Sequence, residues 1–69
     1  MKRRDLLRAL RLSAKEAGVD LAIVRNGASH DIYRLGDLVI TIPRHNELNE
    51  MTARGILKDA AAYLKGRDR

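Results

Sequence analysis

Apolar residues recur at steps of three and four along residues 3–17, which is the spacing of one face of an α-helix. Gly18 follows directly, and a glycine just after the last periodic residue is typical of a helix end. The pattern therefore predicts a first helix over residues 3–17. Its apolar positions are Leu6, Leu7, Leu10, Ala14 and Ala17.

The middle of the chain changes to the period of β-strands. Short aliphatic runs are separated by Asn26-Gly27 and Gly36-Asp37, dipeptides that favour tight turns because their residues tolerate positive φ. Apolar residues alternate in residues 38–42, as expected for a strand with one buried face. Short turns require antiparallel neighbours, so we expect a three-stranded meander. The predicted strands are residues 20–25, 29–34 and 38–42.

A second helical pattern follows a polar loop. Asn49 is a favourable N-cap, and Glu50 places negative charge in the first turn, where the helix dipole favours it. Gly55 lies beside the apolar stripe, where it could allow close packing at a cost of roughly 1 kcal/mol relative to alanine. The pattern predicts a helix over residues 50–64 and a frayed tail over residues 65–69. The stripe consists of Ala53, Ile56, Leu57, Ala60 and Leu64.

Two amphipathic helices and one half-buried sheet predict a single α+β domain over residues 1–69. Both helices pack on one face of the sheet in an α-β-β-β-α two-layer sandwich, and the other face stays open. This is the arrangement of double-stranded-RNA-binding domains, although fold analogy alone establishes no function. A chain of 69 residues without Phe or Trp has a small aliphatic core, so a covering partner would add stability.

Several classes of protein are excluded by composition. The absence of cysteine excludes disulfides, thiolate metal sites and a cysteine nucleophile. No apolar run approaches the ~20 residues needed to span a bilayer, so we expect no membrane association. The basic start of the chain is not followed by the uncharged apolar stretch of a secretory signal. The expected location is the cytoplasm.

The charge is strongly positive, with 14 Lys and Arg against nine Asp and Glu and a formal net charge of +5. It indicates a polyanionic partner, either nucleic acid or an acidic protein, unless it serves solubility alone. Four cations fall on one face of the first predicted helix, each three or four residues from the next. That row is either a solvated helix face or a stripe that contacts phosphates. It consists of Arg4, Arg8, Arg11 and Lys15.

The chain has two histidines, His30 and His45, and neither suggests a metal site. They lie in separate segments, and no carboxylate accompanies either at a familiar ligand spacing. Ser29 is a poor nucleophile for His30, because adjacent residues of a strand point to opposite faces. Asp31 faces away from His30 for the same reason.

Histidine acid–base chemistry on a basic protein remains. Imidazole titrates near neutral pH, and RNA carries its own nucleophile in the 2′-OH, so no metal or other cofactor is required. Cations near the turn and strand ends could stabilise the charged phosphorane, or could simply be solvated. These candidate phosphate-binding residues are Arg25, Arg34 and Arg44. Taken alone, His30 is better explained as a structural histidine bonded to a loop carbonyl than as a catalytic one.

Three segments carry a further signal. Residues 27–33 (GASHDIY) place glycine, serine and histidine before an apolar and an aromatic residue, residues 41–50 (TIPRHNELNE) contain proline–arginine–histidine–asparagine–glutamate, and residues 52–58 read TARGILK. In this order and spacing, the segments resemble the HicA toxins of bacterial HicA–HicB toxin–antitoxin modules. The resemblance covers about residues 3–60. It departs at Ala28, because family members usually place the glycine closer to the serine and histidine.

The resemblance implies a metal-independent endoribonuclease that cleaves mRNA and arrests translation. It also implies a double-stranded-RNA-binding-like fold and neutralisation by a cognate HicB-like antitoxin. The catalytic histidine of the family matches His30, and His45 matches a second motif histidine that could donate the complementary proton. Two alternatives stay open: a non-catalytic RNA-binding module of the same fold, and a subunit that only binds an acidic antitoxin.

Overall fold

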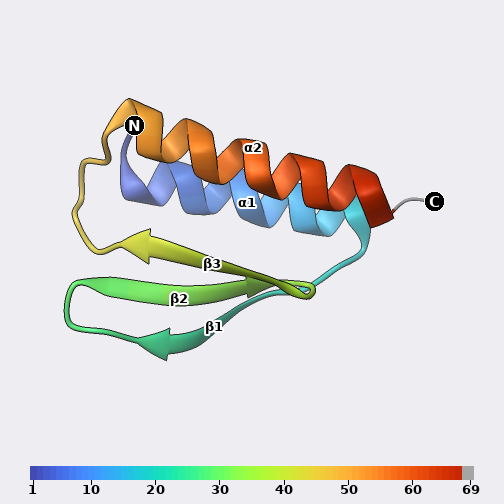
Figure 1. Ribbon diagram of the computed structural model, residues 1–69, viewed down its shortest axis with the longest axis horizontal. Coiled ribbons are helices and arrows are strands. Elements are labelled where there is room, and N and C mark those ends of the chain that lie inside the picture. Colours follow the sequence, from blue (N-terminus) through green and yellow to red (C-terminus); the bar gives the residue numbers. More distant parts are fainter. Residues whose placement is uncertain (68–69) are drawn as a thin grey trace.

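The computed structural model describes residues 1–67, and within them the chain folds as helix, three strands and helix. The strands form one antiparallel sheet in the order β1-β2-β3. Figure 1 shows both helices on the same side of this sheet. The predicted α-β-β-β-α fold is therefore confirmed. The elements are α1 (Arg3–Ala17), β1 (Leu21–Asn26), β2 (His30–Leu35), β3 (Leu38–Pro43) and α2 (Glu50–Arg67).

The two helices run in the same direction, so both begin at one end of the molecule (Figure 1). The turn between β1 and β2 lies at this end, and so does the connection from β3 to α2 (Figure 1). We call it the loop end, made of residues 1–4, 26–30 and 43–49. The β2–β3 turn lies at the opposite end. The loop end therefore gathers segments that are far apart in the sequence.

The core lies between the helices and the inner face of the sheet. Tyr33 and Leu35 of β2 are buried, as are Ile40 and Ile42 of β3, so the predicted alternation of β3 is confirmed. Both helices bury the predicted apolar stripes, with Ala17 and part of the α2 stripe half-buried. The buried hydrophobic side chains are Leu6, Leu7, Leu10, Ala14, Tyr33, Leu35, Ile40, Ile42, Leu48, Ala53 and Ala60.

The second helix is longer than the sequence predicted. It continues to Arg67, so the expectation of a frayed tail was wrong for residues 65–67, while residues 68–69 lie outside the described residues. This part of α2 is anchored by a contact distant in sequence: the hydroxyl of Tyr63 accepts a hydrogen bond from the backbone N–H of Asp37 at 2.8 Å. Lys65 in the last turn also has a favourable sign for the helix dipole. No helix within residues 1–67 has both the length and the apolar character needed to cross a membrane.

The Asn26-Gly27 turn differs from the prediction. Asn26 is the last residue of β1, and neither residue has a positive φ; Gly36 does, at 59°, as its turn requires. Gly27 is required for space instead. Its N–H donates a hydrogen bond to the carbonyl of His30 at 3.0 Å, and a Cβ at this position would overlap that oxygen.

The expectation of close packing at Gly55 was also wrong. Gly55 is exposed, and a Cβ added there would meet no heavy atom within 4 Å. The helical periodicity placed this residue beside the apolar stripe, but the stripe at this turn of α2 is only half-buried at Ile56 and Leu57. The glycine therefore weakens the helix without an evident packing role.

Candidate functional site

His30 is the first residue of β2 and lies opposite Pro43 of β3 in the ladder. Its side chain is exposed, whereas that of its neighbour Asp31 is buried, so the two point to opposite faces as the sequence predicted. Across the described residues, the His30 imidazole makes no hydrogen bond to another protein group. This disfavours a structural histidine tied to a loop carbonyl and leaves an imidazole open to solvent.

The two histidine-bearing segments lie side by side at the loop end. The N–H of Arg44 donates to the carbonyl of Ser29 at 3.0 Å. Nη1 of the Arg44 guanidinium donates to the carbonyl of Gly27 at 2.9 Å, across 17 positions of sequence. His45 follows in the connection to α2, where it is exposed. The fold thus brings the backbone that carries His30 next to the backbone that carries His45.

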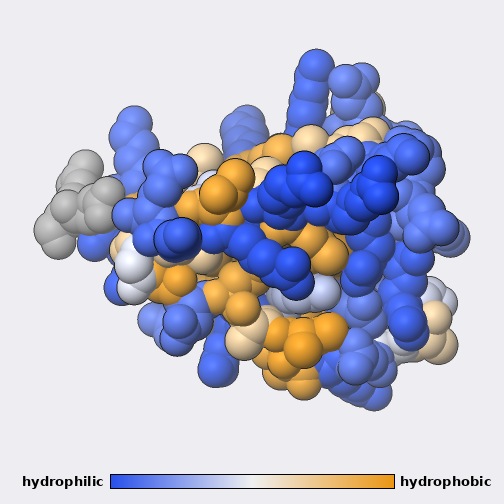
Figure 2. Space-filling model, turned by 180° about the vertical axis from the view of Figure 1, so that it is seen from behind, coloured by the Kyte–Doolittle hydropathy of each residue, from blue (hydrophilic) through white to orange (hydrophobic). Residues whose placement is uncertain are grey.

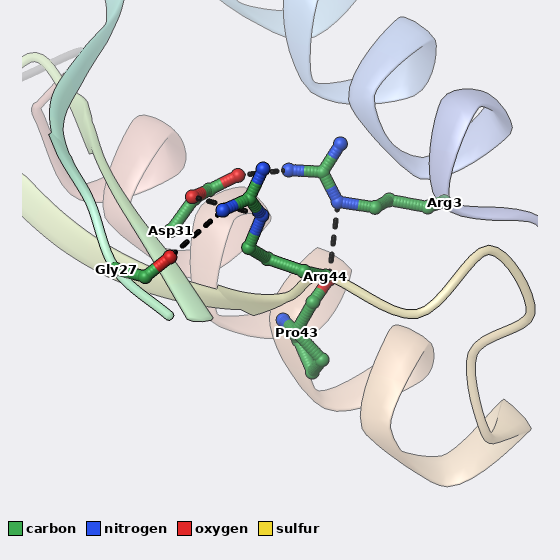
Figure 3. A network of polar contacts seen from close by, with 5 residues as sticks. All are labelled: Arg3, Gly27, Asp31, Pro43 and Arg44. Carbon is green, nitrogen blue, oxygen red and sulfur yellow. Dashed lines mark hydrogen bonds and ion pairs between the residues drawn. The ribbon is translucent and has the colours of Figure 1, made fainter. Parts of the chain in front are cut away.

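A buried carboxylate lies on the other side of the same strand. Asp31 is 4% exposed, and its Oδ2 accepts a hydrogen bond from Nη2 of Arg3 at 2.5 Å. Nε of Arg3 donates to the carbonyl of Pro43 at 3.0 Å, as Figure 3 shows. Arg3 therefore joins the first turn of α1 to both β2 and the end of β3.

The second cation near Asp31 is Arg44. Its Nε lies 3.6 Å from Oδ1 of Asp31, which makes an ion pair but is too long for a good hydrogen bond. Within residues 1–67, this buried Oδ1 has no hydrogen-bond partner. The guanidinium of Arg44 lies between the carboxylate and the carbonyl of Gly27 (Figure 3). Charge on the buried Asp31 is thus compensated by two arginines.

The open face of the sheet carries the other two arginines predicted near the strand ends. Arg34 lies on the same face of β2 as His30 and opposite Val39, while Arg25 lies opposite Ile32. Both arginines are exposed. Since paired residues share a face, Arg25 is a diagonal neighbour of His30, a separation of about 7–8 Å. The open face therefore carries His30 and two arginines beside the apolar side chains of Ile32 and Val39.

The predicted basic row of α1 is exposed at all four positions. Figure 2 shows many strongly hydrophilic side chains over the upper part of this face, with hydrophobic surface between them and a further hydrophobic area at the lower edge. The lower part of this view corresponds to the β1 edge of Figure 1, where Ile23 and Val24 are exposed. At the loop end, an open pocket of about 370 Å³ is lined by Lys2, Arg3, Arg4, Leu7 and Asn46.

The sequence did not indicate that Arg3 belongs to this site, nor that Asp31 is buried in it. The strand alternation does contain a signal for the burial of Asp31. Asp31 stands at an inward position of β2, in phase with Tyr33 and Leu35, and a buried carboxylate requires a cationic or hydrogen-bonding partner. The sequence did not identify that partner, because Arg3 is 28 positions away.

In the part of the chain that the structure describes, no group of three or more His, Cys, Asp or Glu residues could hold a metal ion. Comparisons with protein-family models, curated proteins and solved structures gave no match. The likenesses to HicA toxins and to double-stranded-RNA-binding domains therefore rest on the motif segments and on the order of the elements.

Proposed function

We propose that this protein is a HicA-like toxin, a metal-independent endoribonuclease that cleaves mRNA in the cytoplasm and arrests translation. The observation that supports it most is the position of His30, which is exposed on the open face and whose imidazole makes no protein hydrogen bond within residues 1–67. Two of the three segments that resemble the HicA motifs, residues 27–33 and 41–50, are also hydrogen-bonded to each other through Arg44. Segments that act together in one site should meet in this way.

In the proposed reaction, His30 accepts the proton of a ribose 2′-OH. The freed oxygen attacks the adjacent phosphorus, the bond from phosphorus to the 5′ oxygen breaks, and a second acid protonates that leaving oxygen. His45 is the proposed donor, because its backbone follows the residue bonded to Ser29. Arg25 and Arg34 stabilise the charge on the pentacoordinate phosphorus. The products are a 2′,3′-cyclic phosphate and a 5′-OH.

The RNA backbone would be held by cations that carry no sequence information. The exposed row along α1 provides a line of charge, and the pocket between Arg4 and Asn46 provides a concave basic surface at the loop end. Arg3 is the exception among these cations, since its guanidinium is bonded to Asp31 and Pro43. We propose a cognate acidic HicB-like antitoxin as the protein partner, covering His30 or the basic face.

The decisive experiment uses purified protein and a 5′-labelled synthetic RNA in the presence of EDTA. We expect fragments ending in 2′,3′-cyclic phosphate, and we expect their loss in His30→Ala. Because His30 is exposed, this substitution should change stability by no more than about 0.5 kcal/mol, which urea unfolding can verify. Lys58→Ala, an exposed cation of α2, is the control. Full cleavage by folded His30→Ala would overturn the assignment.

A non-catalytic RNA-binding module is the second candidate, and the exposed basic row of α1 favours it. It predicts salt-sensitive RNA retention without any cleavage. The same assay separates the two, because cyclic-phosphate ends that depend on His30 exclude a module that only binds. Expression in a host without antitoxin adds a second readout: growth arrest by the parent chain and normal growth with His30→Ala.

A further inference from the structure

Arg44 holds the turn before His30 through two separate groups. Its backbone N–H donates to the carbonyl of Ser29 at 3.0 Å, and its Nη1 donates to the carbonyl of Gly27 at 2.9 Å. The turn is closed on itself by the N–H of Gly27, which donates to the carbonyl of His30 at 3.0 Å. The backbone that leads into His30 is therefore held at Gly27 by the side chain of Arg44 and at Ser29 by the backbone of Arg44.

The guanidinium of Arg44 is in turn oriented by a buried group. Nε faces Oδ1 of Asp31 at 3.6 Å, while Arg3 holds Oδ2 of the same carboxylate. Figure 3 shows the Arg44 head group between Asp31 and Gly27. Because the Asp31 side chain is only 6% exposed and anchored to α1, it is a fixed point against which Arg44 can be aligned.

This arrangement uses the planar geometry of arginine. Nη1 donates to a carbonyl while Nε faces a carboxylate at ion-pair distance, an arrangement that a lysine ammonium on a flexible stem cannot reproduce in the same plane. A side chain committed to two protein oxygens has fewer donors left for RNA. Arg34, by contrast, makes no ion pair or side-chain hydrogen bond within residues 1–67 and is free to contact phosphate.

We propose that Arg44 is a positioning residue, which clamps the turn of residues 27–29 so that His30 is presented on the open face, and that Asp31 acts through Arg44. This inference rests on the proposed function for its catalytic consequence, but the clamp itself can be tested without RNA. It changes the role that the sequence suggested for Arg44, from a phosphate-binding residue to a group that orients the site.

The first test compares Arg44→Ala and Arg44→Lys with Arg34→Ala in single-turnover cleavage and in RNA binding at several salt concentrations. Both Arg44 variants should cleave about tenfold more slowly at saturating protein, the effect of losing one charge-assisted hydrogen bond. The RNA affinity of Arg44→Lys should stay at the parent level. Arg34→Ala should weaken binding and reduce the salt dependence. Weaker RNA binding by Arg44→Ala with an unchanged cleavage rate would identify a phosphate contact and overturn the proposal.

The second test is amide hydrogen exchange on the free protein. In Arg44→Lys, which retains the charge and the backbone donor, the Gly27 amide should exchange about tenfold faster, while the Leu10 amide in α1 is unchanged. Unchanged exchange at Gly27 would overturn the clamp. Faster exchange with a parent-like cleavage rate would overturn its effect on His30. If the parent chain cleaves no RNA, the proposed function fails, and exchange alone decides whether the clamp exists.

Discussion

Arg3 and Asp31 form an ion pair between the first turn of α1 and the central strand, with side-chain exposures of 21% and 6%. Removing one partner of a buried pair typically costs about 3–5 kcal/mol, because the other charge is left uncompensated. Arg44 compensates Asp31 in part, so we predict that Arg3→Ala lowers the free energy of unfolding by about 3 kcal/mol. Urea denaturation measures this directly.

The matched control is Arg4→Ala, since Arg4 is the exposed neighbour of Arg3 in the same turn. It should change stability by no more than about 0.5 kcal/mol. The double variant Arg3→Met/Asp31→Leu removes both charges and should regain most of the lost stability. Equal unfolding midpoints for Arg3→Ala and Arg4→Ala would contradict an energetic role for the pair.

A Cβ at residue 27 would occupy the space of the His30 carbonyl oxygen, so Gly27→Ala should disrupt the turn. We predict a loss of about 1–3 kcal/mol in stability together with loss of RNA cleavage. Gly66→Ala is the control, because within residues 1–67 a Cβ there meets nothing within 4 Å, and alanine in a helix should not lower stability. The measurement is thermal unfolding followed by the cleavage assay. A Gly27→Ala protein with parent stability and activity would show that the turn adapts to a side chain.

Gly55→Ala should make the protein more stable. The added methyl group enters open space on an exposed helix face, and alanine is favoured over glycine in a helix by about 0.8–1 kcal/mol. For a domain of this size, we expect the Tm to rise by about 4–8 °C, as measured by circular dichroism. RNA cleavage should stay unchanged. A lower Tm would contradict the open space beside Gly55.

The basic row of α1 can be tested through the salt dependence of RNA binding. Each phosphate contact contributes about 0.7 to the slope of log affinity against log salt for single strands. The double variant Arg8→Ala/Arg11→Ala should therefore lower the slope by about 1.4. The control is Arg54→Ala/Lys58→Ala, an exposed pair on α2. It removes two positive charges, as the α1 double variant does, so both variants have the same net charge. Identical slopes for the two double variants would indicate a solvated helix face.

The sequence was sufficient for the elements and their order, because periodicity and turn residues act locally. The alternation around Ile40 and Ile42 and the stripe around Leu10 were correctly assigned to the core. The end of α2 was not predicted correctly, and the hydrogen bond that anchors this part of the helix, between Tyr63 and the Asp37 amide, joins residues 26 positions apart. Contacts between residues distant in sequence cannot be predicted from the local pattern of apolar and polar residues.

The candidate site also has a part that the sequence predicted and a part that it did not. The opposite orientation of His30 and Asp31 followed from the strand period alone, whereas the exposure of His30 is known only from the fold. The orientation of Arg44 toward Gly27 could not be predicted, since it depends on a buried carboxylate held by Arg3. The position of Arg44 in a polar loop suggested that it binds phosphate. In the fold, its guanidinium instead donates a hydrogen bond to the carbonyl of Gly27.

β2 separates two environments by a single residue, with His30 in solvent and Asp31 in the core. A shift of one position along the ladder would exchange them, burying an imidazole and exposing the carboxylate that anchors two arginines. Insertion or deletion of one residue in the turn of residues 27–29 should therefore be less tolerated than most substitutions there.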